Sequence, residues 1–285
     1  MIFYFVYKLA QALIMALPLK VAYRFGIFIS DLHYVFANKD RANVMANLEA
    51  IFPDKDEKEL KKIRLSMFRN FAKYLVDFLR FEKLNKESFS DYIHLEGLNY
   101  VDEALKKGRG AIILSAHTGN WELGGVAMAL AGYSIGAVVL PHRHKAVDHF
   151  FNSQRESRGL KVIPLGRAVR DCITLLHENK LLALLGDRGF GDRGIIVDFF
   201  GKPTLLPRGP AALAIREGTP LVLAFTLRNE DDTCVLKFEK IIDFSPSGDK
   251  EADIKALVEE YKVAIENVVR KNPDQWFMFP RFWLP

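Results

Sequence analysis

The stretch AIILSAHTGNWELGG, residues 111–125, decides the fold. Its apolar run follows Gly110, is too short for a typical helix and predicts a buried strand that delivers His117 to its carboxyl end. The next three letters, TGN, are turn or N-cap residues, and the Ala, Leu and Met content of 121–130 predicts a helix. This order places a histidine where α/β sheets bind their ligands, at the carboxyl end of a strand.

His117 and Glu122 are five positions apart in this stretch. One continuous helix would separate them by about 140° around its axis, so their cooperation requires the intervening turn. A histidine next to a carboxylate is a general base held in one tautomer, and we predict this pair to be catalytic. Gly119 and Asn120 would orient the site or help to bind an oxyanion near the helix start. The alternative is a histidine that ends a strand and a glutamate that favours the helix dipole.

From Ile93 onward, apolar runs alternate with amphipathic segments, which predicts βαβ units and a mostly parallel sheet flanked by helices. The fold class is therefore α/β. The expected strands are 111–116, 134–140, 161–165, 181–186, 195–200, 220–227 and 233–242. The expected helices are 121–130, 145–158, 169–179, 209–217 and 250–270.

The chain begins with two apolar stretches. Residues 1–17 are apolar apart from one lysine and one glutamine, Pro18 interrupts them, and 21–36 form the second stretch. A helix over the first stretch would be about 25 Å long, slightly less than the bilayer core of about 30 Å. We expect a monotopic membrane anchor or a short hairpin, with one spanning helix or a packed helical layer as alternatives. The expected division is a membrane-associating segment, 1–36, and one domain, 37–285.

The net charge limits the classes of partner that are expected, and the cysteine content indicates the compartment. The net charge of +5, from 40 basic and 35 acidic residues, suits an anionic membrane surface, a phosphorylated substrate or an acidic carrier protein. The surplus is too small to indicate nucleic acid. Cys172 and Cys234 form no C-x-x-C pair, which fits a reducing cytosol. No carboxylate or cysteine stands at metal-ligand spacing from His142 and His144, so we predict no metal site.

The segment GDRGFGDRG, residues 186–194, contains a formal G-x-G-x-x-G. A dinucleotide fingerprint must open a helix, and here a strand is expected to follow, so we predict no dinucleotide site. Arg188 and Arg193 are expected to bind phosphate through their guanidinium forks. Arg208 stands at the start of the next helix and would act with it on an anion. The alternative is a hairpin turn with solvated arginines.

Four segments carry a family resemblance: HTGNWE, RANVMANLEAIFPD from Arg41, the block 186–222 and PDQWFMFPRF from Pro273. The first resembles the H-x4-D/E (HX4E) box of the glycerolipid acyltransferases. All four, in their order along the chain, resemble the branch that contains the lipid A late acyltransferases and the mycobacterial phosphatidylinositol mannoside acyltransferases. Two departures stand out. Many lipid A enzymes have Asp-Gln where this chain has Asp187-Arg188, and their last segment usually contains a histidine that this chain lacks.

The resemblance implies a membrane-associated O-acyltransferase of the lipid A late acyltransferase type. It would move an acyl chain from acyl carrier protein or coenzyme A to an anionic glycolipid, first of all a lipid A precursor, without a metal or other cofactor. It places the Asp187 and Arg188 block at the acceptor site and the protein at the inner (cytoplasmic) membrane, facing the cytoplasm. The alternatives are a phosphatidylinositol mannoside or lysophospholipid acyltransferase and a non-catalytic lipid-binding protein.

Overall fold

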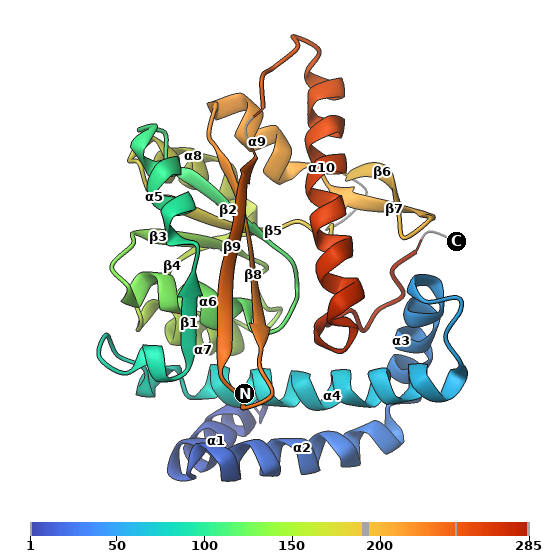
Figure 1. Cartoon of the computed structure of the whole chain (residues 1–285). Helices are drawn as coiled ribbons and strands as arrows, with labels where there is room; N and C mark the ends of the chain where they lie inside the picture. Colours follow the sequence, from blue (N-terminus) through green and yellow to red (C-terminus); the bar gives the residue numbers. More distant parts are fainter. Residues whose placement is uncertain (1, 190–193, 243, 284–285) are drawn as a thin grey trace.

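The computed structural model describes residues 2–189, 194–242 and 244–283. Its central sheet has the strand order β1-β9-β8-β2-β5-β3-β4 (Figure 1). Neighbouring strands in it are parallel except β8 and β9, so the expected mostly parallel sheet is confirmed. The strands are β1 (Ile93–Glu96), β2 (Ala111–Ser115), β3 (Ile135–Val139), β4 (Lys161–Pro164), β5 (Leu181–Leu185), β8 (Leu221–Arg228) and β9 (Cys234–Ile242).

Strand β2 lies inside the sheet between β5 and β8, and both of its faces are buried. Ile112 and Leu114 point into one core cluster, and Ala111 and Ile113 point into the other. A strand that is buried on both faces needs a continuous apolar run, which is what the sequence supplies. The first cluster includes side chains of α8 (Ala168–His177), α9 (Gly209–Glu217) and α10 (Lys250–Lys271), and the second includes side chains of α5 (Leu98–Lys106) and α6 (Trp121–Leu130).

A separate antiparallel hairpin consists of β6 (Gly194–Phe199) and β7 (Lys202–Pro207). The sequence predicted the first of these strands and missed the second. The glycine pattern of 186–194 leads into β6, so it does not open a helix as a dinucleotide-binding loop would.

The N-terminal third forms a helical layer next to the sheet. It consists of α1 (Ile2–Ala16), α2 (Leu19–Phe36), α3 (Asn38–Ile51) and α4 (Glu57–Leu79). The side chain of Asp56 caps α4 by accepting the N–H of Glu59 at 2.8 Å. Helix α4 runs along one edge of the sheet, and α1 and α2 lie on its far side (Figure 1).

The expected N-terminal apolar membrane anchor is wrong. Among the described residues, no helix has the length and the apolar character needed to cross a membrane. Ile14, Ala22 and Tyr23 are buried in a cluster with α4. Arg80, just after α4, donates hydrogen bonds to the carbonyl groups of Ile14 and Leu17 at 2.6 and 2.8 Å. The two helices are therefore packed into the fold, and the domain boundary at residue 36 stays a prediction.

Candidate active site

The chain leaves β2 in a tight turn that carries His117. Thr118 donates its N–H to the carbonyl oxygen of Ala116 at 2.7 Å, across His117. Gly119 has a φ of +54°, and a Cβ atom there would lie 2.1 Å from the carbonyl oxygen of Thr226 on β8. Only glycine fits such an approach, so the turn lies directly against the neighbouring strand.

The ring of His117 is hydrogen-bonded to the carboxylate of Asp187, with 2.8 Å between Nδ1 and Oδ1. The other carboxylate oxygen accepts the backbone N–H of His117 at 3.0 Å. The sheet register explains this meeting. Ser115 at the end of β2 lies opposite Leu185 at the end of β5, and His117 and Asp187 each follow two residues later. Both side chains therefore emerge at the same edge of the sheet.

The environment keeps Asp187 ionised. Its side chain is completely buried. Burial by itself would raise the pKa of this carboxyl group, but the attraction and hydrogen bonds of His117 hold the pKa below its usual value. An ionised carboxylate can only accept hydrogen bonds, so Nδ1 of His117 carries the proton. Nε2 is then left with a lone pair and can act as a base.

Glu122 has a different partner. Its carboxylate accepts two hydrogen bonds from the guanidinium of Arg155 on α7 (Lys145–Glu156), at 2.8 Å from Nε and 2.5 Å from Nη2. Although burial opposes the charge on Arg155, the attraction of Glu122 raises the pKa of the guanidinium. No hydrogen bond among the described residues joins Glu122 to His117. The structure gives His117 another carboxylate than the expected one, and the catalytic roles of His117 and Glu122 stay predictions.

The C-terminal segment after α10 fastens the turn. The N–H of Phe277 donates to the carbonyl oxygen of His117 at 2.9 Å, and the N–H of Gly119 donates to the carbonyl oxygen of Gln275 at 2.8 Å. Between these contacts, the indole of Trp276 donates from Nε1 to Oδ2 of Asp187 at 2.9 Å. The tail therefore holds both the histidine and its carboxylate partner.

Aromatic rings form a wall beside His117. The ring of Trp121 meets it edge to face, with 5.0 Å between the centroids, and Tyr74 of α4 stacks on Trp121 at 4.7 Å. Burial and then the charge of Glu122 raise the pKa of Tyr74 well above its usual value. The wall makes this side of the imidazole largely apolar.

Gly119 and Asn120, the expected oxyanion or orientation residues, lie in the turn with their polar groups engaged. The N–H of Gly119 is bound to Gln275, as described above. Asn120 is completely buried. Its Oδ1 accepts the N–H of Leu123 at 3.0 Å and thereby caps α6, while its Nδ2 donates to Asp77 of α4 at 2.8 Å. This arrangement supports orientation of the turn.

Two of the expected acceptor-binding arginines, Arg188 and Arg208, have different partners. Arg188 donates to the carbonyl oxygen of Phe277 at 3.0 Å, and burial lowers the pKa of its guanidinium. Arg208 pairs with Glu251 of α10 at 2.6 Å and is partly exposed. Arg193 lies outside the described residues. Asp187, which was expected at the acceptor site, binds His117 instead.

The sequence did not indicate two side chains that bind the carboxylates near His117: Arg155, which binds Glu122, and Trp276, which binds Asp187. The histidine partner was also assigned wrongly, although a signal for Asp187 existed. His117 and Asp187 each directly follow an expected strand of six residues, 111–116 and 181–186, and pairing these strands as parallel neighbours in register would have joined them. Across the described part of the chain, no three His, Cys, Asp or Glu side chains gather to hold a metal ion.

Known proteins that are similar to this chain are bacterial acyltransferases. The sequence profile of the bacterial lipid A biosynthesis acyltransferase family matches residues 1–285. A phosphatidylinositol mannoside acyltransferase of Mycolicibacterium smegmatis is 27% identical over 284 residues, which cover 98% of this chain and 90% of that protein. The enzyme of the same name from Mycobacterium tuberculosis H37Rv is 27% identical over 252 residues, 86% of this chain and 76% of the relative. A lipid A biosynthesis acyltransferase of Haemophilus influenzae is 22% identical over 258 residues, 90% of this chain and 78% of the relative.

Proposed function

The chain belongs to the bacterial lipid A biosynthesis acyltransferase family, and from this premise we propose that His117 is the general base of an acyl transfer to a glycolipid. The chain is an acyltransferase of the lipid A late acyltransferase type. The observation that carries the proposal is the 2.8 Å contact between Nδ1 of His117 and the buried Asp187, because it leaves Nε2 as the basic atom.

In the proposed reaction, Nε2 of His117 removes the proton of an acceptor hydroxyl. The resulting alkoxide attacks the thioester carbonyl, and the tetrahedral intermediate collapses with departure of a thiolate. The imidazolium returns the proton to the thiolate, so the products are an ester and a free thiol. Asp187 stabilises the imidazolium in between.

The oxyanion of this intermediate needs hydrogen-bond donors. The N–H groups of Thr118 and Gly119 already have acceptors, and so does Nδ2 of Asn120. We therefore assign the oxyanion to the first N–H groups of α6, at Trp121 and Glu122, which point out of the helix start. The ion pair of Glu122 with Arg155 holds this helix start against α7.

The acceptor that we propose is a phosphorylated glycolipid, in the first place a lipid A precursor. A phosphatidylinositol mannoside is the second candidate, favoured by the greater identity to the mycobacterial relatives. Arg208 is the proposed phosphate ligand, because it is partly exposed and precedes α9. The sequence also suggested Asp187, Arg188 and Arg193 for this site. Asp187 binds His117 and Arg188 binds Phe277 of the C-terminal tail, so these contacts support a role in positioning the histidine and the tail.

We also propose that the enzyme works at the cytoplasmic side of the inner membrane. The lipid acceptor and the net charge of +5 support contact with an anionic lipid surface. Contact with the membrane is tested by sedimenting the protein with vesicles that contain or lack anionic lipid. Absence of the protein from both pellets would contradict the proposed membrane contact.

The function is tested with the purified full chain. Acyl carrier protein and coenzyme A thioesters are each offered with a lipid A precursor, a phosphatidylinositol mannoside or a lysophospholipid, and thiol release and the mass of the product are measured. We expect acceptor-dependent thiol release, reduced by about two to four decades in His117→Ala. Lipid binding without any thiol release would instead identify a non-catalytic lipid-binding protein. Wild-type turnover in His117→Ala would end the general-base mechanism.

A further inference from the structure

A buried polar cluster lies between the helical layer and the turn of His117. It consists of Tyr23 of α2, Asp77 of α4, Asn120 of the turn and Arg228 at the end of β8, and each of these side chains is at most 7% exposed. Oδ1 of Asp77 accepts a hydrogen bond from the hydroxyl of Tyr23 at 2.5 Å. Oδ2 accepts Nδ2 of Asn120 at 2.8 Å and also forms a short ion pair with Arg228.

Asp77 holds this cluster together, because both of its oxygens are occupied. Removing its charge would leave the guanidinium of Arg228 buried beside neutral groups, which is costly in a protein interior. Although burial opposes the charge on Arg228, the attraction of Asp77 raises the pKa of this guanidinium. A buried ion pair adds little net stability compared with an apolar pair, so its value to the protein lies in the geometry that it imposes.

The cluster reaches the catalytic turn by two routes. The first is Asn120 itself, which caps α6 three residues after His117. The second passes through Gln275, whose side chain exchanges two hydrogen bonds with the backbone of Arg228, at 2.8 and 2.9 Å. The carbonyl oxygen of the same Gln275 accepts the N–H of Gly119. Gly119 and Asn120 are therefore both linked to Asp77, Asn120 directly and Gly119 through Gln275 and Arg228.

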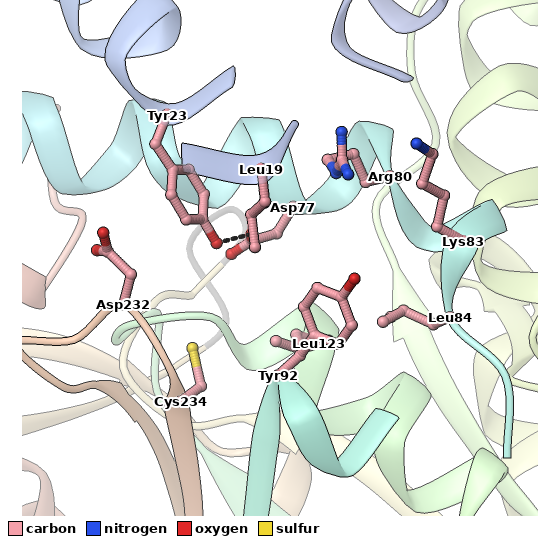
Figure 2. Close-up of a pocket in the computed structure, with 10 residues that line it drawn as sticks. All are labelled: Leu19, Tyr23, Asp77, Arg80, Lys83, Leu84, Tyr92, Leu123, Asp232 and Cys234. Carbon is pink, nitrogen blue, oxygen red and sulfur yellow. Dashed lines mark hydrogen bonds between the residues drawn. The ribbon is translucent and has the colours of Figure 1, made fainter. Parts of the chain in front are cut away.

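The space next to the cluster is too small for a substrate. Tyr23 and Asp77 line a cavity with Leu123 and Cys234, and the hydroxyl of Tyr23 points at the carboxylate of Asp77 (Figure 2). The cavity leaves about 20 Å³ for the centre of a water-sized sphere, enough for a water molecule and no more. Asp77 can therefore influence the reaction only through the residues that it holds.

We propose that Asp77 is a positioning residue for acyl transfer, which sets the place of the turn at 117–120 through Asn120 and Arg228. This inference rests on the proposed function. It means that the helical layer, and not the sheet alone, fixes where Nε2 of His117 meets the substrate. A displacement of about 1 Å in a reacting group costs about 100-fold in rate. A change in the cluster that shifts the turn slightly should therefore lower kcat far more than it alters KM.

The test exchanges the two polar groups that face each other. Asp77→Asn removes the charge, Asn120→Asp places a second carboxylate opposite the first, and the double variant restores one carboxylate and one amide. Aspartate still caps a helix as well as asparagine does. The matched control is Lys73→Gln, because Lys73 also joins α4 to the β8–β9 turn, through an ion pair with Asp232 at 2.5 Å, and does not touch Asn120.

We expect kcat to fall by about 10- to 100-fold in each single variant, with KM within about twofold, and to recover to within about tenfold of wild type in the double variant. Lys73→Gln should keep the wild-type kcat. A folded Asp77→Asn enzyme with wild-type kcat would overturn the proposal, and so would an equal loss in Lys73→Gln. If the charge variants do not fold, Tyr23→Phe keeps every charge of the cluster and removes only the hydrogen bonds of the hydroxyl, to Asp77 at 2.5 Å and from Arg228 at 3.2 Å, and it should still lower kcat by about threefold or more. An unchanged kcat there overturns the proposal.

A second measurement separates this inference from the proposed function. Amide hydrogen exchange of peptides covering 117–130 should accelerate in Asp77→Asn, return toward wild type in the double variant and stay unchanged in Lys73→Gln. This readout needs no turnover. If wild type transfers no acyl group while the exchange pattern holds, the proposed function fails and the positioning of the turn stands. If the exchange of 117–130 is the same in all variants, the positioning fails even when the enzyme is active.

Discussion

The end of β5 and the start of α6 each bring a carboxylate toward the turn of His117, and the two carboxylates have different partners. Asp187 stands 70 residues from His117 and binds its ring, whereas Glu122 stands five residues away and binds Arg155. The guanidinium of Arg155, which binds Glu122, is permanently charged, whereas the imidazole of His117, which binds Asp187, can gain and lose a proton. Register between parallel strands, and not spacing along the chain, selects the carboxylate that can serve a general base.

The largest expected effect is that of Asp187→Asn. We expect kcat to fall by about two to four decades with little change in KM, because the amide can no longer fix the tautomer or stabilise the imidazolium. The matched control is Glu217→Gln, which alters another His–carboxylate contact, between His177 at the end of α8 and Glu217 at the end of α9, at 2.8 Å. A wild-type kcat in Asp187→Asn would remove the distinction between the two carboxylates.

The partner of Glu122 can be measured by a double-mutant cycle on the free energy of unfolding. Glu122→Gln and Arg155→Met should each destabilise the protein by about 3 kcal/mol, and the double variant by much less than the sum, because both break one buried ion pair. Glu122→Gln combined with His117→Ala should be additive within about 0.5 kcal/mol. A large coupling of Glu122 with His117 would contradict the observed pairing.

The indole of Trp276 should have a smaller effect. Trp276→Phe removes one hydrogen bond to the Asp187 carboxylate, worth about 1.5 kcal/mol or somewhat more, so kcat should fall about tenfold. Trp283→Phe is the matched control, since no partner for its buried indole N–H is found among the described residues. Equal losses in the two variants would show that aromatic packing of the tail matters, and not the bond to Asp187.

The smallest expected effect is on the pH dependence of stability. Because the pKa of Asp187 is lowered in the folded protein, its stabilising contribution is present above its ordinary pKa of about 3.9 and is lost as the pH falls through the folded value. Stability of the wild type should therefore fall more steeply below about pH 5 than that of Asp187→Asn. Urea unfolding from about pH 6 to about pH 3 measures both slopes, and equal slopes would mean that the pKa is not lowered.

Much of the sheet could be predicted because its strands are continuous apolar runs. β2 and β5 are each five residues long, β2 is buried along nearly its whole length, and the turn after β2 contains glycine and asparagine, which favour turns. The partner of His117 could not be predicted in this way, because it depends on which strands become neighbours. The contribution of Trp276 depends equally on where the tail folds back.

The N-terminal helices show a second limit of the sequence. Their apolar residues were taken for a membrane anchor, yet the buried face of this layer includes Gln11, Ala22 and the polar end of Tyr23, while Phe5 and Leu9 are exposed. Composition alone does not tell which face of an apolar helix is covered. Helix α4 packs against both α1 and α2, and α7 also packs against α1. These contacts cannot be predicted from the first 36 residues alone.

The most direct test of the account is the tautomer of His117, read by nitrogen-15 NMR of the histidines in wild type, Asp187→Asn and Glu122→Gln at neutral pH. The spectrum of His117→Ala identifies the His117 signals. The account predicts a proton on Nδ1 in wild type and in Glu122→Gln, and loss of this preference in Asp187→Asn. A proton on Nε2 in wild type, or a change caused by Glu122→Gln and not by Asp187→Asn, would contradict the account.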